Sequence, residues 1–200
     1  MCIRDRSSLD PAEPDAELMD VLAEESRLMP HLHISAQHGD DLILRRMKRR
    51  HLSRDIMRFC DEARRRRPDV AFGADIIAGF PTESDVAHQQ TMTMIKDADI
   101  SYLHVFPYSP RQSTPAAAMP QLDAAVIKQR AGALRELGKA QLHQHLETAI
   151  GTTDRMLVES GNVGHGKNFA KIRLDQPFVP ASSLVDVKIC LLYTSDAADD

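Results

Sequence analysis

The 200-residue sequence has no long run of apolar residues, and its amino terminus lacks the apolar core of a secretory signal peptide. These absences argue against a membrane-spanning helix, and we expect a cytoplasmic protein with no membrane partner. With 42% hydrophobic and 27% charged residues, the composition is typical of a folded chain with one medium domain and a smaller appendage. The sequence shows no internal repeat and no low-complexity tract.

Close pairs of cysteines are also missing. Cys2, Cys60 and Cys190 lie far apart in the sequence. None of the spacings that hold zinc or an iron-sulfur cluster occurs, so the sequence predicts no metal site within this chain. Cys60 falls on the apolar side of a predicted helix, where a small buried side chain is expected rather than a reactive thiol.

The two ends of the chain do not continue the patterns beside them. Residues 1–6 (MCIRDR) and 190–200 (CLLYTSDAADD) resemble peptides that arise when sequencing-adapter DNA is translated. We therefore expect two non-native tails, which are left out of the fold prediction. A pair of unusual natural tails is the alternative.

Charge is distributed unevenly along the chain. Between Arg45 and Arg67 there are 11 lysines and arginines against three acids, a local balance of +8 within a chain whose net charge is -4. A basic block on an acidic background suggests a polyanionic partner. Two solvated helix faces would give the same composition.

Hydrophobic periodicity predicts alternating strands and helices. Strands are expected at residues 32–35, 70–78 and 102–106, and helices at 10–29, 41–47, 53–67, 82–97 and 123–148. This order predicts an α/β fold with right-handed crossovers and a parallel sheet, either doubly wound or part of a barrel. Short strands at 156–159, 170–174 and 184–189 predict a small β domain from about residue 150.

Chemistry in such folds lies at the carboxyl ends of the strands. At the first end, alternation would send His33, Ser35 and Gln37 to one face, where they could hydrogen-bond a ligand; a structural histidine is the alternative.

The second strand end contains Asp75, Gly79 and Glu83. A glycine here permits close approach of the backbone to a flat ligand, and a carboxylate inside an apolar strand needs a partner. At the third end, Arg111 suits a carboxylate or phosphate, or lies in a solvated loop.

Read in order, these segments resemble the radical-SAM core of the methylthiotransferases. The matching pieces are His33-x-x-x-Gln37-x-Gly39, Leu44-x-x-Met47-x-Arg49, Asp75-Ile-Ile-x-Gly79-Phe80-Pro81-x-Glu83, Tyr108-Ser109-x-Arg111 and Thr114-Pro115-Ala116. The resemblance implies the carboxyl-terminal part of a partial TIM-like barrel over residues 7–149. Residues 150–189 resemble the start of the small RNA-binding TRAM domain that follows the core.

In this family the core binds S-adenosylmethionine on a [4Fe-4S] cluster, generates a 5'-deoxyadenosyl radical and inserts a methylthio group at a C–H bond. The cluster needs a Cys-x-x-x-Cys-x-x-Cys loop, which this sequence does not contain, so we expect an inactive fragment of the enzyme. The resemblance implies the following cofactor-binding set: His33, Gln37, Asp75, Ile77, Gly79, Pro81, Glu83, Tyr108 and Arg111.

The same resemblance points to tRNA as the substrate, and to no DNA partner. The run from Met29 to Ser35 and the basic residues that follow are most similar to the branch that modifies N6-threonylcarbamoyladenosine at position 37 of tRNA. Isopentenyladenosine tRNA and a ribosomal-protein aspartate remain alternative substrates, and Gln37-His38 is closer to the last. Contacts to RNA phosphates are expected from Arg45, Arg46, Lys48, Arg49 and Arg50.

Two functions of other classes stay open. One is a non-catalytic RNA-binding module, suggested by the basic block and the terminal β segment. The other is a barrel enzyme that uses Asp75 and Glu83 as an acid–base pair, which is disfavoured because the sequence identifies no partner for either carboxylate. The sequence carries no signal for an oligomeric state.

Overall fold

The computed structural model describes residues 8–175 and 177–192 and contains two compact units, residues 1–141 and 142–200. Each unit is described by itself. The predicted tail at residues 1–6 lies outside the described residues, as do residues 193–200 of the predicted tail at 190–200. No helix in the described part of the chain is both long enough and apolar enough to cross a membrane.

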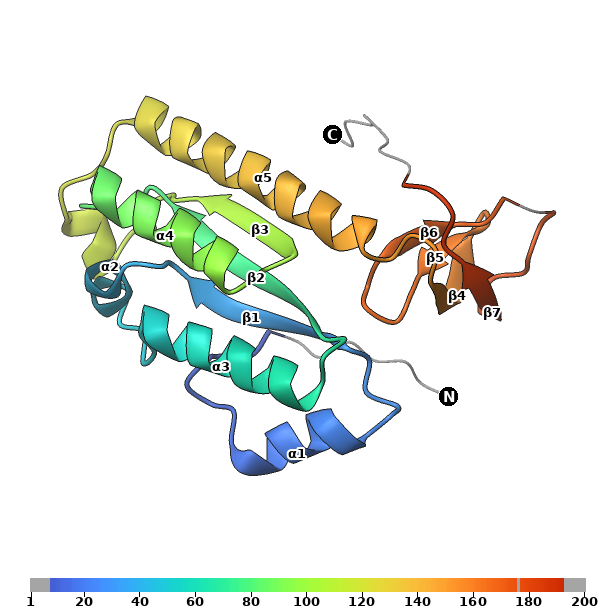
Figure 1. Cartoon of the computed structure of the whole chain (residues 1–200). Coiled ribbons are helices and arrows are strands. Elements are labelled where there is room, and N and C mark those ends of the chain that lie inside the picture. The colour runs from blue at the N-terminus through green and yellow to red at the C-terminus, as the bar shows by residue number, and fades with distance from the viewer. Residues whose placement is uncertain (1–7, 176, 193–200) are drawn as a thin grey trace. The chain divides into compact units, whose positions relative to one another are not determined.

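The first unit is an α/β unit with a parallel sheet (Figure 1), as the alternation predicts. Its three strands lie side by side in the order β1-β2-β3 and both pairs are parallel. The elements in chain order are α1 (Ala16–Glu24), β1 (His31–Gln37), α2 (Asp41–Arg46), α3 (Ser53–Arg66), β2 (Ala71–Ala78), α4 (Asp85–Asp97), β3 (Tyr102–Pro107), the 3-10 helix η1 (Pro115–Ala118) and α5 (Ala124–Glu147).

One face of the sheet packs against helices and forms the core. Leu32 and Ile34 of β1 and Phe72 of β2 lie in this layer with apolar residues of α1, α3, α4 and α5. Successive side chains of a strand point to opposite faces, so His33 and Ser35 lie on the other face and are only half-buried. Within this unit the helices cover one face only, which fits a segment of barrel wall rather than a doubly wound sheet.

The predicted helix at residues 10–29 is wrong at both ends. Asp15 is the N-cap, because its carboxylate accepts a hydrogen bond from Leu18 N at 2.8 Å, and α1 begins only at Ala16. Upstream, Leu9 forms a parallel bridge with Ile34 of β1. The helix ends at Glu24, where Glu25 turns extended. Capping at Asp40 and Ser84 sets the starts of α2 and α4.

The second unit contains a small antiparallel sheet in the order β6-β5-β4-β7. Its strands are β4 (Thr153–Ser160), β5 (Val163–His165), β6 (Lys171–Arg173) and β7 (Leu184–Lys188). Met156, Val158 and Ile172 form its core. β5 is absent from the sequence prediction because its residues, Val-Gly-His, include only one strongly apolar side chain, whereas β6 lies in a run that also contains Ala170 and Leu174.

Two glycines provide a matched test of this packing. A Cβ at Gly39 would lie 2.5 Å from the Cα of Thr91, which is backbone of α4, so Gly39→Ala must displace a helix. We expect Gly39→Ala to lower the free energy of unfolding by about 1–3 kcal/mol.

The control is Gly132 in the middle of α5, where a Cβ would meet nothing within 4 Å. Gly132→Ala should raise the free energy of unfolding by up to about 1 kcal/mol because alanine favours the helix. Urea unfolding curves measure both changes, and a neutral Gly39→Ala variant would contradict the close approach.

Candidate functional site

The carboxyl ends of the three parallel strands lie at one edge of the sheet. The register pairs Gln37 of β1 with Ile76 of β2 and Ala78 of β2 with Pro107 of β3, and Tyr108 N donates to Ala78 O at 2.8 Å. The predicted residues on β1, on β2 and at the start of the loop after β3 are therefore brought to the same edge.

The turn after β2 is held by a hydrogen bond between its own ends. Gly79 has a φ of 75°, and its N–H donates to a carboxylate oxygen of Glu83 at 2.5 Å. Gly79 is closely packed, since a Cβ there would lie 2.7 Å from Cγ1 of Ile127 in α5. Glycine is therefore needed at this position both for its backbone conformation and for the approach of a helix.

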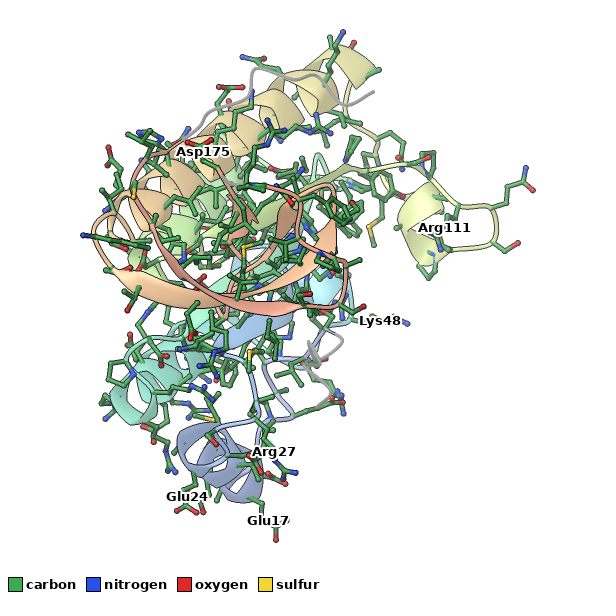
Figure 2. The ribbon with its side chains drawn as sticks, turned by 90° about the vertical axis from the view of Figure 1, so that its right-hand side faces the viewer. Glu17, Glu24, Arg27, Lys48, Arg111 and Asp175 are labelled. Atoms are coloured by element: carbon green, nitrogen blue, oxygen red, sulfur yellow. The ribbon has the colours of Figure 1, made fainter. Side chains whose placement is uncertain are left out.

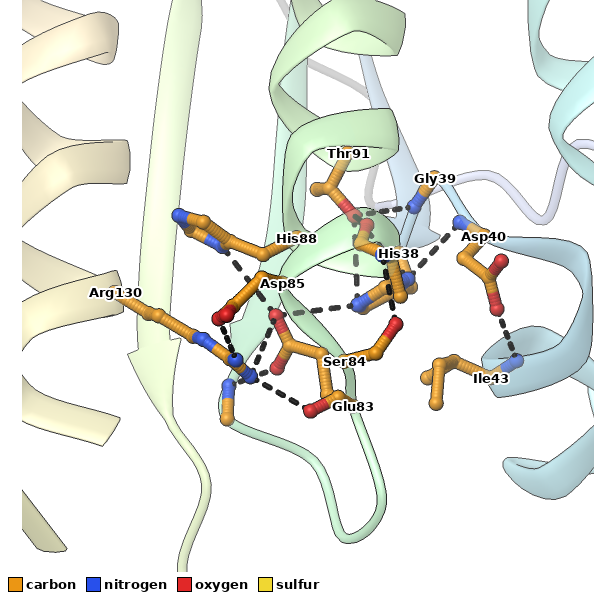
Figure 3. Close-up of polar contacts among 12 residues, drawn as sticks. His38, Gly39, Asp40, Ile43, Glu83, Ser84, Asp85, His88, Thr91 and Arg130 are labelled. Atoms are coloured by element: carbon orange, nitrogen blue, oxygen red, sulfur yellow. Dashed lines mark hydrogen bonds and ion pairs between the residues drawn. The ribbon is translucent and has the colours of Figure 1, made fainter. Parts of the chain in front are cut away.

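Glu83 forms a buried ionic cluster at this edge (Figure 3). Its side chain is 1% exposed and lies near three cationic or titratable partners: His38 Nε2 at 3.7 Å, His88 Nδ1 at 3.3 Å and Arg130 Nη1 at 3.6 Å. Arg130 also donates to the backbone oxygen of Glu83 at 2.9 Å and pairs with Asp85 at 2.6 Å. The cluster joins the end of β1, the start of α4 and the face of α5.

The position of Glu83 sets its protonation. Burial alone raises the pKa of a carboxyl group, but the nearby side chains of His38, His88 and Arg130 outweigh burial and lower the pKa of Glu83 to about 2. Glu83 is therefore a carboxylate throughout the physiological range, with its oxygens occupied by protein groups.

We expect Glu83→Gln to destabilise the protein by roughly 3 kcal/mol at pH 7, since the pKa falls from 4.5 to about 2 on folding. A lowered folded-state pKa means that this stability is present above pH 4.5 and is lost as the pH falls towards 2. The difference between wild type and variant should therefore shrink over that interval in urea unfolding series.

Asp85→Asn is the matched control, because Asp85 also pairs with Arg130 but its side chain is 98% exposed. A solvated pair contributes less than about 1 kcal/mol. If the two variants were equally destabilised, the central role of Glu83 would be refuted.

On the face of the sheet without helices, Asp75 has the partner that a carboxylate in an apolar strand requires. His33 Nε2 lies 2.9 Å from Asp75 Oδ1, and His104 Nδ1 lies 3.4 Å from the same oxygen. Ile77, two residues further along β2, is half-buried on this face and packs against the small apolar cluster around Phe80. Asp75 and Glu83 both have partners, contrary to the sequence interpretation, but they belong to separate networks.

Gln37 does not follow the predicted alternation. Its φ is 65° and the register of β1 against β2 shifts between Ile34 and Gln37, so Gln37 is buried while Ser35 stays half-exposed. The prediction that His33, Ser35 and Gln37 share one face in regular alternation is therefore wrong at Gln37. A strand pattern cannot show a residue whose backbone leaves the β region.

Tyr108 and Pro81 line the inner part of the strand-end edge. The Tyr108 ring packs edge-on against Phe80 at 5.4 Å, and its hydroxyl is buried without a hydrogen-bond partner among the described residues. Pro81 is buried in the turn after β2. Such an orphaned hydroxyl is a polar group for which a bound molecule could supply the missing hydrogen bond.

Arg111 does not join these residues. It is exposed on the loop between β3 and η1, and Figure 2 shows that loop projecting from the ribbon. The solvated-loop alternative describes its position better than a ligand contact at the strand ends.

The basic block divides into paired and unpaired cations. Six of its side chains form ion pairs with acidic residues: Arg50, Arg58, Arg64, Arg65, Arg66 and Arg67. Arg46 donates to the hydroxyl of Thr82 in the turn after β2. Arg45, Lys48, Arg49 and Arg54 have no ion pair within the described part of the chain, and Lys48 points outward in Figure 2.

The cysteines of the described residues cannot hold an iron-sulfur cluster. Cys60 is fully buried in the core, as the sequence predicts, and burial raises the pKa of its thiol to about 12. Cys190 is exposed in the other unit. Two thiols do not make up the three-thiolate set that a [4Fe-4S] cluster requires.

Sequence reasoning missed four residues of these networks. His38 enters the sequence analysis only in the comparison of substrate branches, and no sequence signal marks His88 or Arg130, which lie in helices far along the chain. His104 could have been found, because alternation on β3 and the parallel pairing place it opposite Asp75.

Comparison with known proteins shows which superfamily the first part of the chain matches. Residues 6–95 match the Radical SAM superfamily. The matched segment contains β1, β2 and the turn that leads to Glu83, so this part of the chain carries a radical SAM domain.

Within this superfamily the chain is similar to tRNA methylthiotransferases. It is 49% identical over 170 residues to a threonylcarbamoyladenosine tRNA methylthiotransferase of Rickettsia prowazekii, covering 85% of this chain and 40% of that protein. It is 34% identical to a tRNA-2-methylthio-N(6)-dimethylallyladenosine synthase of Neorickettsia sennetsu, over 94% and 40% of the two chains. It is 35% identical to a threonylcarbamoyladenosine tRNA methylthiotransferase of Thermotoga maritima, and the match covers 76% of this chain and 36% of that protein.

The chain thus spans two fifths or less of the length of these relatives. Among solved structures, coproporphyrinogen III oxidase from Escherichia coli superposes with a TM-score of 0.49 and 18% identity, over 85% of this chain and 35% of that one. That likeness is too slight to support an argument about function.

Proposed function

We propose that this chain is the part of a radical SAM tRNA methylthiotransferase that carries one side of the cofactor site and a tRNA-binding surface, with N6-threonylcarbamoyladenosine at position 37 of tRNA as the substrate. The observation that carries the proposal is the 49% identity to a threonylcarbamoyladenosine tRNA methylthiotransferase over 85% of the chain. A dimethylallyladenosine enzyme aligns over 94% of the chain but at 34% identity, which makes isopentenyladenosine tRNA the second candidate substrate.

The residues at the strand ends fit one side of an S-adenosylmethionine site. Tyr108 offers a buried hydroxyl without a partner, Gln37 offers an amide at the same edge, and Ile77 offers apolar surface. When bound, S-adenosylmethionine would supply the radical chemistry of the family. Glu83 acts here as a positioning residue, because its oxygens hold the Gly79 turn and the α5 arginine instead of facing a ligand.

The cluster does not fit the described residues, so no step of the reaction is assigned to a cluster in this chain. The chain's own residues hold the strand-end edge in place for the cofactor and bind RNA. The RNA surface consists of the unpaired cations Arg45, Lys48, Arg49 and Arg54. Arg50 and Arg46 contribute less, because each is already engaged within the protein.

A tRNA titration tests this surface. The triple variant Arg45→Ala, Lys48→Ala, Arg49→Ala should weaken tRNA binding and make the slope of log K against log salt shallower by about 2 to 3, because each lost phosphate contact removes up to about one released counterion. Filter binding or fluorescence anisotropy across a salt series measures both quantities.

The matched control removes three paired arginines of the same block, Arg58→Ala, Arg65→Ala and Arg66→Ala. Each of these guanidinium groups lies against a carboxylate, at 3.5, 2.7 and 2.5 Å respectively. The slope should change by less than about 1. Equal losses in the two triple variants would mean that total charge, rather than this surface, determines binding.

The substrate is tested with the whole reading frame from which this chain derives. Expressed in a strain that lacks methylthiolation of threonylcarbamoyladenosine, it should restore the methylthio form of that nucleoside, measured by mass spectrometry of digested tRNA. The methylthio form of isopentenyladenosine alone would identify the second substrate. Absence of both products, with the protein present and loaded with iron and sulfide, would overturn the proposed function.

A further inference from the structure

We propose that His33, Asp75 and His104 form a binding site for a divalent transition-metal ion such as Zn²⁺, separate from any iron-sulfur cluster. One residue comes from each strand of the parallel sheet, on the face that the helices leave free. Two imidazoles and one carboxylate are ligands that Zn²⁺ and its neighbours prefer. The inference does not depend on the proposed function.

The spacing of the three groups suits a metal ion. Bonds of about 2.0–2.2 Å from zinc to nitrogen and oxygen place neighbouring ligand atoms roughly 3–3.5 Å apart. The oxygen of Asp75 lies 2.9 Å from His33 Nε2 and 3.4 Å from His104 Nδ1, and one potential ligand atom from each residue lies within 4.8 Å of the others. A small side-chain rotation would close the set around one ion.

The sheet holds the ligands in place. Asp75 is on the central strand, and the register pairs it directly with His104 on β3. His33 is paired with Gly73, where a Cβ would lie 2.5 Å from His33 Nδ1. The absent side chain at Gly73 therefore leaves the space that the His33 ring occupies.

The cluster also leaves room for further ligands. The side chains of His33, Asp75 and His104 are 16%, 24% and 60% exposed, so the site is anchored at one side and open at the other. Three protein ligands with an open position are the arrangement that allows a metal ion to keep water or to bind a second molecule. Without an ion, the same geometry gives an imidazole–carboxylate hydrogen-bond network, and that is the competing interpretation.

Isothermal titration of the full chain with ZnCl₂ distinguishes the two. The chain is first treated with a chelator and carries Cys2→Ser and Cys190→Ser, which leave Cys60 as its one cysteine. We expect one Zn²⁺ to bind the parent chain. His104→Ala and Asp75→Asn should each weaken binding by at least about 100-fold, the upper end of what loss of even an outer-shell partner costs.

His143→Ala is the matched control, since His143 is also half-exposed and lies 3.3 Å from a carboxylate, that of Glu147. It should change the affinity by less than about threefold. Far-UV circular dichroism establishes whether each variant is folded. If Asp75→Asn does not fold, His104→Ala alone decides the test, because the His104 side chain is 60% exposed and its loss should leave the fold intact.

A second measurement is the melting temperature with and without saturating Zn²⁺. A ligand that binds only the folded state raises the melting temperature, so the parent and His143→Ala should be stabilised and His104→Ala should not. No binding to the parent chain, or equal binding by the parent and His104→Ala, would overturn the metal site and leave the hydrogen-bond network.

Discussion

The buried carboxylate of Glu83 is the constraint on which the strand-end edge depends. A charge with a side chain 1% exposed is tolerated only because His38, His88 and Arg130 surround it. These partners come from β1, α4 and α5, so the electrostatic requirement of one side chain determines how three elements meet. The Gly79 turn, and with it the strand-end edge, has its geometry because the same carboxylate also accepts the Gly79 N–H.

Periodicity in the sequence was sufficient for most of the fold. The parallel sheet and its helices follow from the pattern of apolar residues, and the helix predicted at residues 53–67 agrees with α3 to within one residue. The errors are local. Asp15 rather than Asp10 caps α1, and β5 includes only one strongly apolar side chain. The start of α1 depends on a single hydrogen bond, which a hydrophobic pattern does not record.

The candidate site was harder to predict because its side chains are partnered across long sequence separations. Asp75 was recognised as a carboxylate in need of a partner, and its register in the sheet supplies two of them. Glu83 was expected to face a ligand, yet its partners are protein groups. The basic block shows the same limitation: the sequence contains 11 cations, whereas in the structure six of them pair with acidic residues. The sequence gives the number of charged residues, whereas the fold determines which of them remain available for a binding partner.

The polar character of the helix-free face has a consequence for how a barrel could assemble around it. His33, Asp75 and His104 place polar groups on this face, so exposing them to water costs less free energy than exposing an apolar surface would. Leu9 forms one parallel bridge at the edge of β1, so backbone pairing can extend the sheet on that side. The part of this face around Asp75 is therefore suited to contact with water or a polar molecule, whereas Ile77 provides an apolar contact beside it.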